Sequence, residues 1–249
     1  MKKIFVVILF AVLAISCSSD SNSSNTTVLL KKLTYTSNGN LNPTEITYNY
    51  QGNKLYQQFR NGVLSVQYYY SENLIDHVEI YSAAGDYVAE VFIYTYDAQN
   101  RLIKALIHNV DLSEDTFKET YTYNSDGTVS VERFRFSLDD WSAYPPSKFF
   151  FDSNGEIVNK VYYLSNGTTH TEILSYDEYP NPFRNVEGFD KLLDQVEGMR
   201  FNLTSVENGL DPIDDVIKTY TYGSNEFPSQ MLMTRPNATN QVTQYNYFY

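Results

Sequence analysis

The chain has 249 residues, 18 basic and 30 acidic side chains, and a formal net charge of −12. A field of that sign repels nucleic acid and anionic lipid headgroups, which argues against both as partners. Cys17 is the only cysteine, so the chain cannot form an internal disulfide and must draw its stability from packing.

Residues 1–16 have the pattern of a targeting segment. Two lysines precede an apolar stretch, Ile4 to Ile15, that is short for a membrane span. The junction Leu13-Ala14-Ile15-Ser16-Cys17 resembles a bacterial lipoprotein signal with its lipobox, although alanine stands where leucine is usual. The resemblance implies that Cys17 is lipidated and becomes the first mature residue. The alternative is an ordinary secretory signal beside a chance cysteine.

Residues 17–28 are predicted to form a flexible tether, and residues 29–249 a single domain. The ten residues after Cys17 are all Ser, Asp, Asn or Thr and have no apolar periodicity. Removing residues 1–16 leaves 233 residues, within the range of one all-β domain. Two lysines are lost with the signal, so the mature chain carries 16 basic against 30 acidic side chains, a net charge of −14.

A repeated pattern predicts the architecture. Two aromatic residues separated by one residue run into a polar turn and then an aliphatic residue, most clearly in Tyr94 to Leu102 and Tyr121 to Val129. This is a strand, a turn and a second strand, and turns such as Ser125-Asp126-Gly127 tolerate positive φ. We therefore expect an all-β fold, an antiparallel up-and-down meander of roughly 14–16 strands that curls or closes because closure removes unpaired edges. The copies centre on Tyr35, Tyr50, Tyr70, Tyr96, Tyr123, Phe151, Tyr176 and Tyr222.

One segment interrupts the repeat. The prolines of Tyr179-Pro180-Asn181-Pro182-Phe183 cannot donate to a central strand. The spacing of Phe189, Leu192, Leu193 and Val196 then predicts one short helix near 189–196, ended by Gly198. If this helix caps an open end of the sheet, Phe189 and Leu193 would seal the opening, and Asp190, Asp194 and Glu197 would border it.

The copies resemble YD repeats, the Tyr-Asp hairpins of Rhs-type cell-surface proteins, as in Tyr96-Asp97 and Tyr176-Asp177. More closely, the chain resembles Bacteroidetes lipoproteins of unknown function, including families described with a porin-like fold. The likeness also covers the loop from Asn181 to Asn185, Tyr220-Thr221-Tyr222 and the ending Thr243-Gln244-Tyr245. The resemblance implies no catalytic residues.

Few residues suggest a site. The loop Trp141 to Pro146 holds the only tryptophan, and rings on such loops stack against sugars or peptides, so Trp141 and Tyr144 are the candidate ligand contacts. Cross-strand packing is the alternative role for these rings. The sequence lacks nucleophile motifs, and its three histidines, His77, His108 and His170, are not at metal-binding spacing, so we predict no metal and no cofactor.

Loop carboxylates leave an enzyme open as an alternative. Asp139 and Asp140 precede Trp141, and Asp211, Asp214 and Asp215 share a loop; they are solvated turn residues or, in the alternative, the acids of a glycan hydrolase. The preferred hypothesis is a non-catalytic binding or structural module, held at the outer membrane by lipid on Cys17, on its periplasmic or surface face. Candidate partners are a glycan or another envelope protein.

The aromatic ending Tyr245 to Tyr249 is typical of outer-membrane barrels. Strands with charge on both faces, as in residues 130–136, favour a barrel or curled sheet outside the bilayer instead.

Overall fold

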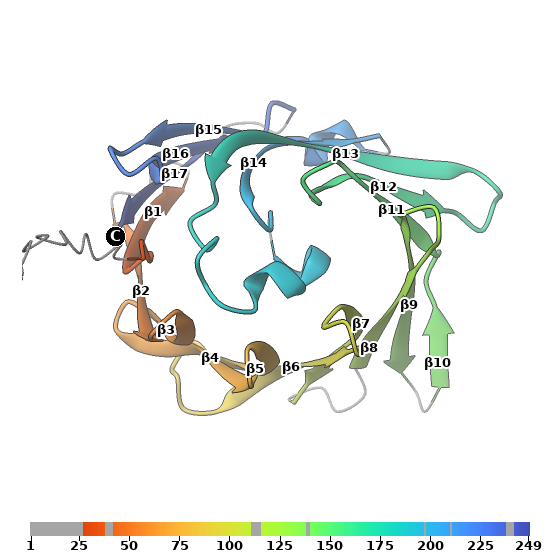
Figure 1. Cartoon of the computed structure of the whole chain (residues 1–249), viewed down its shortest axis with the longest axis horizontal. Coiled ribbons are helices and arrows are strands. Elements are labelled where there is room, and N and C mark those ends of the chain that lie inside the picture. Colours follow the sequence, from red (N-terminus) through yellow and green to blue (C-terminus); the bar gives the residue numbers. More distant parts are fainter. Residues whose placement is uncertain are drawn as a thin grey trace, which may run out of the picture.

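The computed structural model describes residues 27–37, 42–110, 116–137, 140–196, 198–209, 211–237 and 242–249. The predicted signal peptide, Cys17 and most of the tether lie outside these residues. The described chain forms a single antiparallel sheet that closes on itself, because β1 (Lys32–Ser37) pairs with both β2 (Thr44–Gln51) and β17 (Val242–Phe248). Figure 1 shows the resulting ring of strands.

The remaining strands follow one another around this ring in chain order. They are β3 (Lys54–Arg60), β4 (Val63–Ser71), β5 (Leu74–Tyr81), β6 (Val88–Tyr96), β7 (Leu102–Asn109), β8 (Thr116–Tyr123), β9 (Val129–Ser137), β10 (Asp140–Ala143), β11 (Ser147–Phe151), β12 (Ile157–Tyr163), β13 (Thr169–Pro180), β14 (Phe201–Asn208), β15 (Val216–Tyr222) and β16 (Pro228–Thr234). The only helical elements among the described residues are the 3-10 turns η1 (Phe189–Lys191), η2 (Leu193–Gln195) and η3 (Pro212–Asp214).

Seventeen strand segments in the described residues fill sixteen places in the barrel. β9 pairs with β8 along one edge, and along its other edge with both β10 and β11. Ala143 lies opposite Phe134 and Ser147 opposite Val131, so the two short strands together occupy one strand position in the barrel. Pro145 and Pro146 stand at the interruption, where they leave no amide for the ladder. The predicted all-β antiparallel meander is confirmed.

Each repeat builds its own turn. In Tyr96-Asp97, the Asp97 carboxylate accepts the amides of Gln99 and Arg101, at 2.9 and 3.0 Å. Asn100 closes the turn with φ +60, a left-handed conformation that asparagine tolerates. Such turns lie together at one end of the barrel, which we name the turn end: 52–53, 72–73, 97–101, 124–128, 152–156 and 223–227.

The second aromatic residue of a repeat then fastens neighbouring hairpins. The Tyr96 hydroxyl donates to the Ile75 carbonyl at 2.8 Å, and the Tyr123 hydroxyl to the Leu102 carbonyl at 3.0 Å. Both acceptor residues are aliphatic residues of the preceding repeat, and both are fully buried. The same bond joins Tyr50 to Leu30 and Tyr176 to Ile157. The spacing of the repeat therefore places a ring of apolar core at the turn end.

The segment that interrupts the repeat folds into the barrel lumen and fills part of it. Residues 181–200, here named the lumen insert, connect β13 to β14 at the turn end and fold back inside the barrel (Figure 1). Its neck is closed by a bond from the Asn181 amide to the Arg200 carbonyl, 2.9 Å. Phe189, Leu192 and Leu193 are buried, as their spacing predicted.

The predicted continuous helix is instead two 3-10 turns. Leu193, in the middle of the predicted helix, has a left-handed backbone angle, φ +45, and an α-helix cannot pass through such a residue. The acidic residues that were predicted to border an opening of the barrel also differ in part from that prediction. The Asp194 side chain is buried inside the barrel, Asp190 is exposed beside Lys191, and Glu197 lies outside the described residues.

Candidate binding site in the barrel lumen

A buried charge cluster fixes the lumen insert to the β8–β9 wall. Arg133 on β9 reaches Glu119 on β8 at 2.5 Å and Asp194 of the insert at 2.9 Å. The Tyr121 hydroxyl donates to Asp194 at 2.9 Å, and Gln195 donates to Glu119 at 2.8 Å. The Asp194 side chain is only 3% exposed. Burial raises its pKa, while Lys160 and Arg133 oppose the rise.

Glu156 fixes the returning limb of the insert. This buried carboxylate, at the start of β12, accepts three consecutive amides, those of Met199, Arg200 and Phe201, at 3.0, 2.5 and 2.9 Å. On the opposite side the Glu187 amide donates to the Asn53 carbonyl at 3.0 Å. The insert is therefore bonded to walls on several sides of the barrel, and it divides the lumen.

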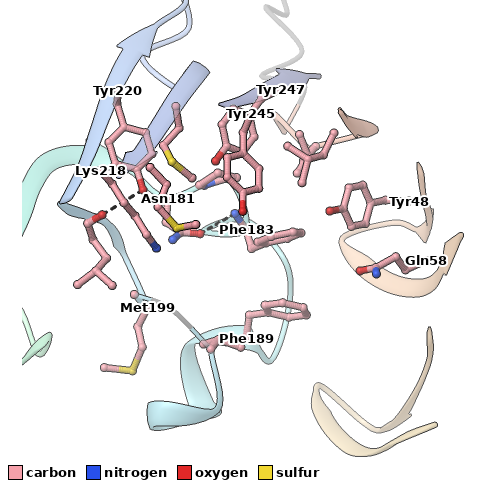
Figure 2. Close-up of a pocket in the computed structure, with 18 of the residues that line it drawn as sticks. Tyr48, Gln58, Asn181, Phe183, Phe189, Met199, Lys218, Tyr220, Tyr245 and Tyr247 are labelled. Atoms are coloured by element: carbon pink, nitrogen blue, oxygen red, sulfur yellow. Dashed lines mark hydrogen bonds between the residues drawn. The ribbon is translucent and has the colours of Figure 1, made fainter. Parts of the chain in front are cut away.

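Several cavities border the insert; one has a volume of about 350 Å³ and is larger than the second cavity described below. Phe183 and Phe189 of the insert form one side, and Tyr48 packs edge-on to Phe183 from β2. Figure 2 shows Lys218, Tyr220, Tyr245 and Tyr247 facing them from β15 and β17. The other lining residues are Leu30, Leu33, Gln58, Tyr68, Asn181, Pro182, Val196, Gly198, Met199, Leu203, Met231 and Met233.

The polar side chains that line this cavity are neutral, five tyrosines, Gln58 and Asn181, apart from one amine. Lys218 extends from β15 into the cavity and is only 5% exposed (Figure 2). Burial raises the pKa values of Tyr48, Tyr68 and Tyr247 well above 10, so their hydroxyls stay protonated at neutral pH. An apolar hollow with a small number of fixed polar groups is the usual form of a small-molecule site.

A second cavity of about 230 Å³ lies beside β12 and β13. Glu156, Glu172 and Asp194 line it together with Lys160. Two of these carboxylates hold the insert in place, and Glu172 accepts the Tyr162 hydroxyl at 3.2 Å. This cavity is therefore part of the anchorage of the insert.

The structure places the predicted ligand contacts on different surfaces. Trp141 lies on the outer face, opposite Phe136, with the Lys118 amine 4.6 Å from its ring. Tyr144 lies on the lumen side, where its ring packs 6.4 Å from that of Phe117. Both are exposed, at 40% and 43%, but they do not form one site. A ligand role for either residue stays a prediction.

The loop carboxylates have structural partners. Asp211 accepts the Ile213 amide at 3.0 Å, Asp215 accepts the Asn208 amide at 2.7 Å, and Asp214 lies 3.9 Å from Arg235. Asp140 accepts the Trp141 amide at 2.7 Å, and Asp139 lies outside the described residues. These contacts are typical of carboxylates in turns and loops.

The histidines are separated in the described structure. His77 stacks on Tyr69 and His108 contacts Thr116 on the outer face, whereas His170 stacks on Tyr162 inside the barrel. No three His, Cys, Asp or Glu side chains converge into a metal site in the part of the chain that is described.

The outer face is largely polar around the first half of the barrel. The cross-strand row from β2 to β10 reads Asn49, Gln57, Gln67, Glu79, Val91, His108, Thr116, Phe136 and Trp141. On the second half, exposed Ile217 lies between Ser205 and Thr234, and exposed Leu232 between Thr219 and Gln244. Along these rows, polar side chains therefore interrupt the apolar ones. Separately, no helix among the described residues has the length and apolar character needed to cross a membrane.

No family model matches the chain, and no curated protein is significantly similar to it in sequence. Among solved structures, a porin-like protein from Bacteroides vulgatus matches with a TM-score of 0.55 and 12% identity, over 90% of this chain and 99% of that one. A porin-like protein from Bacteroides uniformis matches with a TM-score of 0.51 and 13% identity, over 90% and 98%. These likenesses confirm the predicted porin-like fold. Kinship with YD-repeat lipoproteins stays a prediction.

Reasoning from the sequence missed the cavity and its lysine. A signal was present: Lys218, Tyr220 and Tyr222 alternate along one strand, so a lysine occupies a position on the face that the rings define. The partners of that face come from β1 to β4 and from the insert, which are distant in sequence.

Proposed function

We propose that this protein is a lipid-anchored, non-catalytic binding barrel of the bacterial cell envelope, whose plugged lumen receives a small molecule. The observation that carries the proposal is the lumen insert. It occupies the space through which a porin would conduct. Arg133 and Glu156 bond it to the β9–β12 side of the wall, and the Glu187 amide bonds it to Asn53 on the opposite side. The hollow that remains has the size and lining of a binding pocket.

The polar outer face supports attachment by lipid over insertion. A membrane-spanning barrel needs an apolar band about 25 Å tall, and the row through Gln57, Gln67 and Glu79 would instead place amides and a carboxylate in hydrocarbon. In this proposal the membrane is reached through Cys17, and a glycan or another envelope protein is a further candidate partner at exposed loops.

The described start of the chain indicates how the barrel would be oriented. Asn185 of the insert donates to the Val28 carbonyl at 2.9 Å, and Tyr50 donates to the Leu30 carbonyl at 2.7 Å. Residues 28–30 therefore lie at the turn end. A tether leaving from there would hold the plugged end toward the lipid and the loop end away from it.

The test is the full-length Cys17→Ser variant, exported in the native host. We expect it to lose labelling by radioactive palmitate, because the thiol that would accept the acyl chain is gone. A Ser16→Thr variant, which keeps the cysteine, is the control. Unchanged palmitate labelling of the Cys17→Ser protein would refute the assignment of the lipid to Cys17.

A further inference from the structure

Three tyrosine hydroxyls in the cavity of about 350 Å³ have no hydrogen-bond partner among the described residues. They belong to Tyr48 on β2, Tyr68 on β4 and Tyr247 on β17. By contrast, the Tyr220 hydroxyl in the same cavity donates to the Leu203 carbonyl at 3.1 Å. The first three hydroxyls therefore differ from the tyrosines that fasten strands, and they are available to a guest.

The oxygens of these three tyrosines border open space. Each oxygen retains accessible surface although its ring is largely buried, and Tyr48 as a whole is only 7% exposed. Figure 2 shows the Tyr48 hydroxyl on the cavity side of its ring. Burial, and then the nearby Tyr68, raise the pKa of Tyr48, so these two hydroxyls lie near each other and stay protonated at neutral pH. The cavity thus presents neighbouring O–H groups that both donate and accept.

We propose that this cavity binds a neutral small molecule with a ring body and a carbonyl or hydroxyl oxygen, which bonds to the hydroxyls of Tyr48, Tyr68 and Tyr247. The inference rests on the proposed binding function and names its ligand class. A purely apolar guest would displace the water around these hydroxyls without replacing its hydrogen bonds, which lowers affinity. A guest oxygen restores those bonds.

The walls beside the hydroxyls suit a ring. Phe183 and Phe189 of the insert stack on each other at 5.3 Å. Tyr48 packs edge-on to Phe183 at 5.5 Å, and Tyr68 is tilted against Phe189 at 5.7 Å. Aromatic rings favour edge-to-face and offset contacts with further rings. A ring compound can therefore pack against the insert while its oxygen reaches the hydroxyls.

The remaining lining allows guests of more than one shape. Met199, Met231 and Met233 are flexible side chains that adapt to a guest. The volume of about 350 Å³ is at the lower end of the range for ligand pockets, which favours a ligand of one or two rings.

The charges of the lining favour a neutral guest. Lys218 is the one charged side chain among the described residues that line this cavity, and it already has an interaction within the protein. No carboxylate is among these lining residues. A charged ligand would lose its hydration without gaining a dedicated partner, which is costly in a largely apolar cavity.

Calorimetric titration of the full-length protein with 1-indanone and indane tests the role of the hydroxyls. The two probes share a bicyclic skeleton, and only 1-indanone has an oxygen. We expect Tyr48→Phe to weaken 1-indanone binding about three- to tenfold, the contribution of one hydrogen bond, and to change indane binding less than about twofold. Wild type and variants are compared in the same detergent, so partition of the probes into micelles cancels.

Tyr68→Phe and Tyr247→Phe repeat the test at the other two hydroxyls, and each substitution keeps the ring. Circular dichroism confirms the fold of each variant, and if one does not fold the other two decide. Tyr163→Phe, which removes an exposed hydroxyl that does not line the cavity, should alter neither probe. Unchanged 1-indanone binding in all the folded variants, or an equal loss for both probes, would overturn the proposal.

Two charged relatives of the same skeleton test the neutral class. Indane-1-carboxylate is an anion and 1-aminoindane a cation near neutral pH. We expect each to bind the wild-type protein at least about tenfold more weakly than 1-indanone, because burying an ionised group without a partner is costly. Binding of either charged probe as tightly as 1-indanone would refute a neutral ligand.

The outcomes separate this inference from the proposed function. Binding of indane, with no effect of the three tyrosine variants on 1-indanone, would keep a small-molecule barrel and reject the ligand class. Absence of binding by every probe would reject both the ligand class and the small-molecule part of the proposed function. Lipid attachment is measured independently, by palmitate labelling of the Cys17→Ser protein.

Discussion

Two glycines with the same backbone angle have different surroundings. Gly188 in the lumen insert has φ +83, and a Cβ there would lie 3.1 Å from the Asn73 carbonyl oxygen and 3.2 Å from the Ile75 amide nitrogen. Gly167, in the β12–β13 turn, has φ +81 and open space around it. The first glycine thus combines a left-handed backbone with close contact between the insert and the wall, and the second has only the backbone requirement.

Replacing each by alanine separates the two costs. Gly167→Ala should lose about 1 kcal/mol of unfolding free energy, the cost of a left-handed alanine. Gly188→Ala should lose about 1–3 kcal/mol more, because the Cβ would press on backbone that cannot rotate away. Denaturant unfolding of both variants measures the difference. Equal losses would mean that the insert does not rest on the β4–β5 turn as described.

Local sequence predicts the repeated hairpins well, because residues that are close in the sequence determine their turns and strands. The Tyr96-Asp97 pair contains both the ring that fastens the next hairpin and the carboxylate that caps the turn. The insert was harder to predict. The spacing of Phe189 and Leu193 indicated which residues are buried, but not that Asp194 would meet Arg133, 61 residues away. The cavity depends on the same distant pairings, and the sequence gives no register for them.

The pairing of the insert with its wall can be tested by a double-mutant cycle. Arg133→Met alone should destabilise the protein by about 3–5 kcal/mol, because it removes the cation of Glu119 and leaves the buried Asp194 carboxylate with only the more distant Lys160 amine, 3.9 Å away. Adding Asp194→Leu should recover part of that loss, since one of the stranded charges is then removed. Thermal unfolding of the single and double variants provides the coupling energy. Strictly additive losses would contradict the described contact.

On the scale of the whole molecule, the barrel encloses a large group of tyrosines whose ionisation is linked to folding. Burial raises the pKa values of Tyr48, Tyr94 and Tyr247 above the ordinary value of 10, and that of Tyr162 to about 12. The unfolded chain releases these protons near pH 10, while the folded barrel retains them. This contribution to stability is therefore complete below pH 10 and is lost as the pH rises toward the folded-state values.

We therefore expect the barrel to unfold in alkali, with cooperative loss of structure above pH 10. Tyrosinate absorbance and far-ultraviolet circular dichroism should change together for the buried rings, because these ionise only when the wall opens. A folded protein in which all 23 tyrosines had already ionised would contradict the burial described for the lumen.

The join between β1 and β17 gives the ring of strands no structural beginning. Ser37 and Thr243 contact each other at 3.2 Å although they are 206 residues apart, and the Lys31 amide bonds to the Phe248 carbonyl at 2.8 Å. A circular permutant that links these neighbouring ends and opens the exposed turn at Asn61-Gly62 would retain every strand pairing but would start at the opposite rim. If the barrel is lipid-anchored as proposed, a lipid attached to that new start would invert it on the membrane. Under that proposal the position of the chain break, and not the sheet itself, would determine which rim faces away from the lipid.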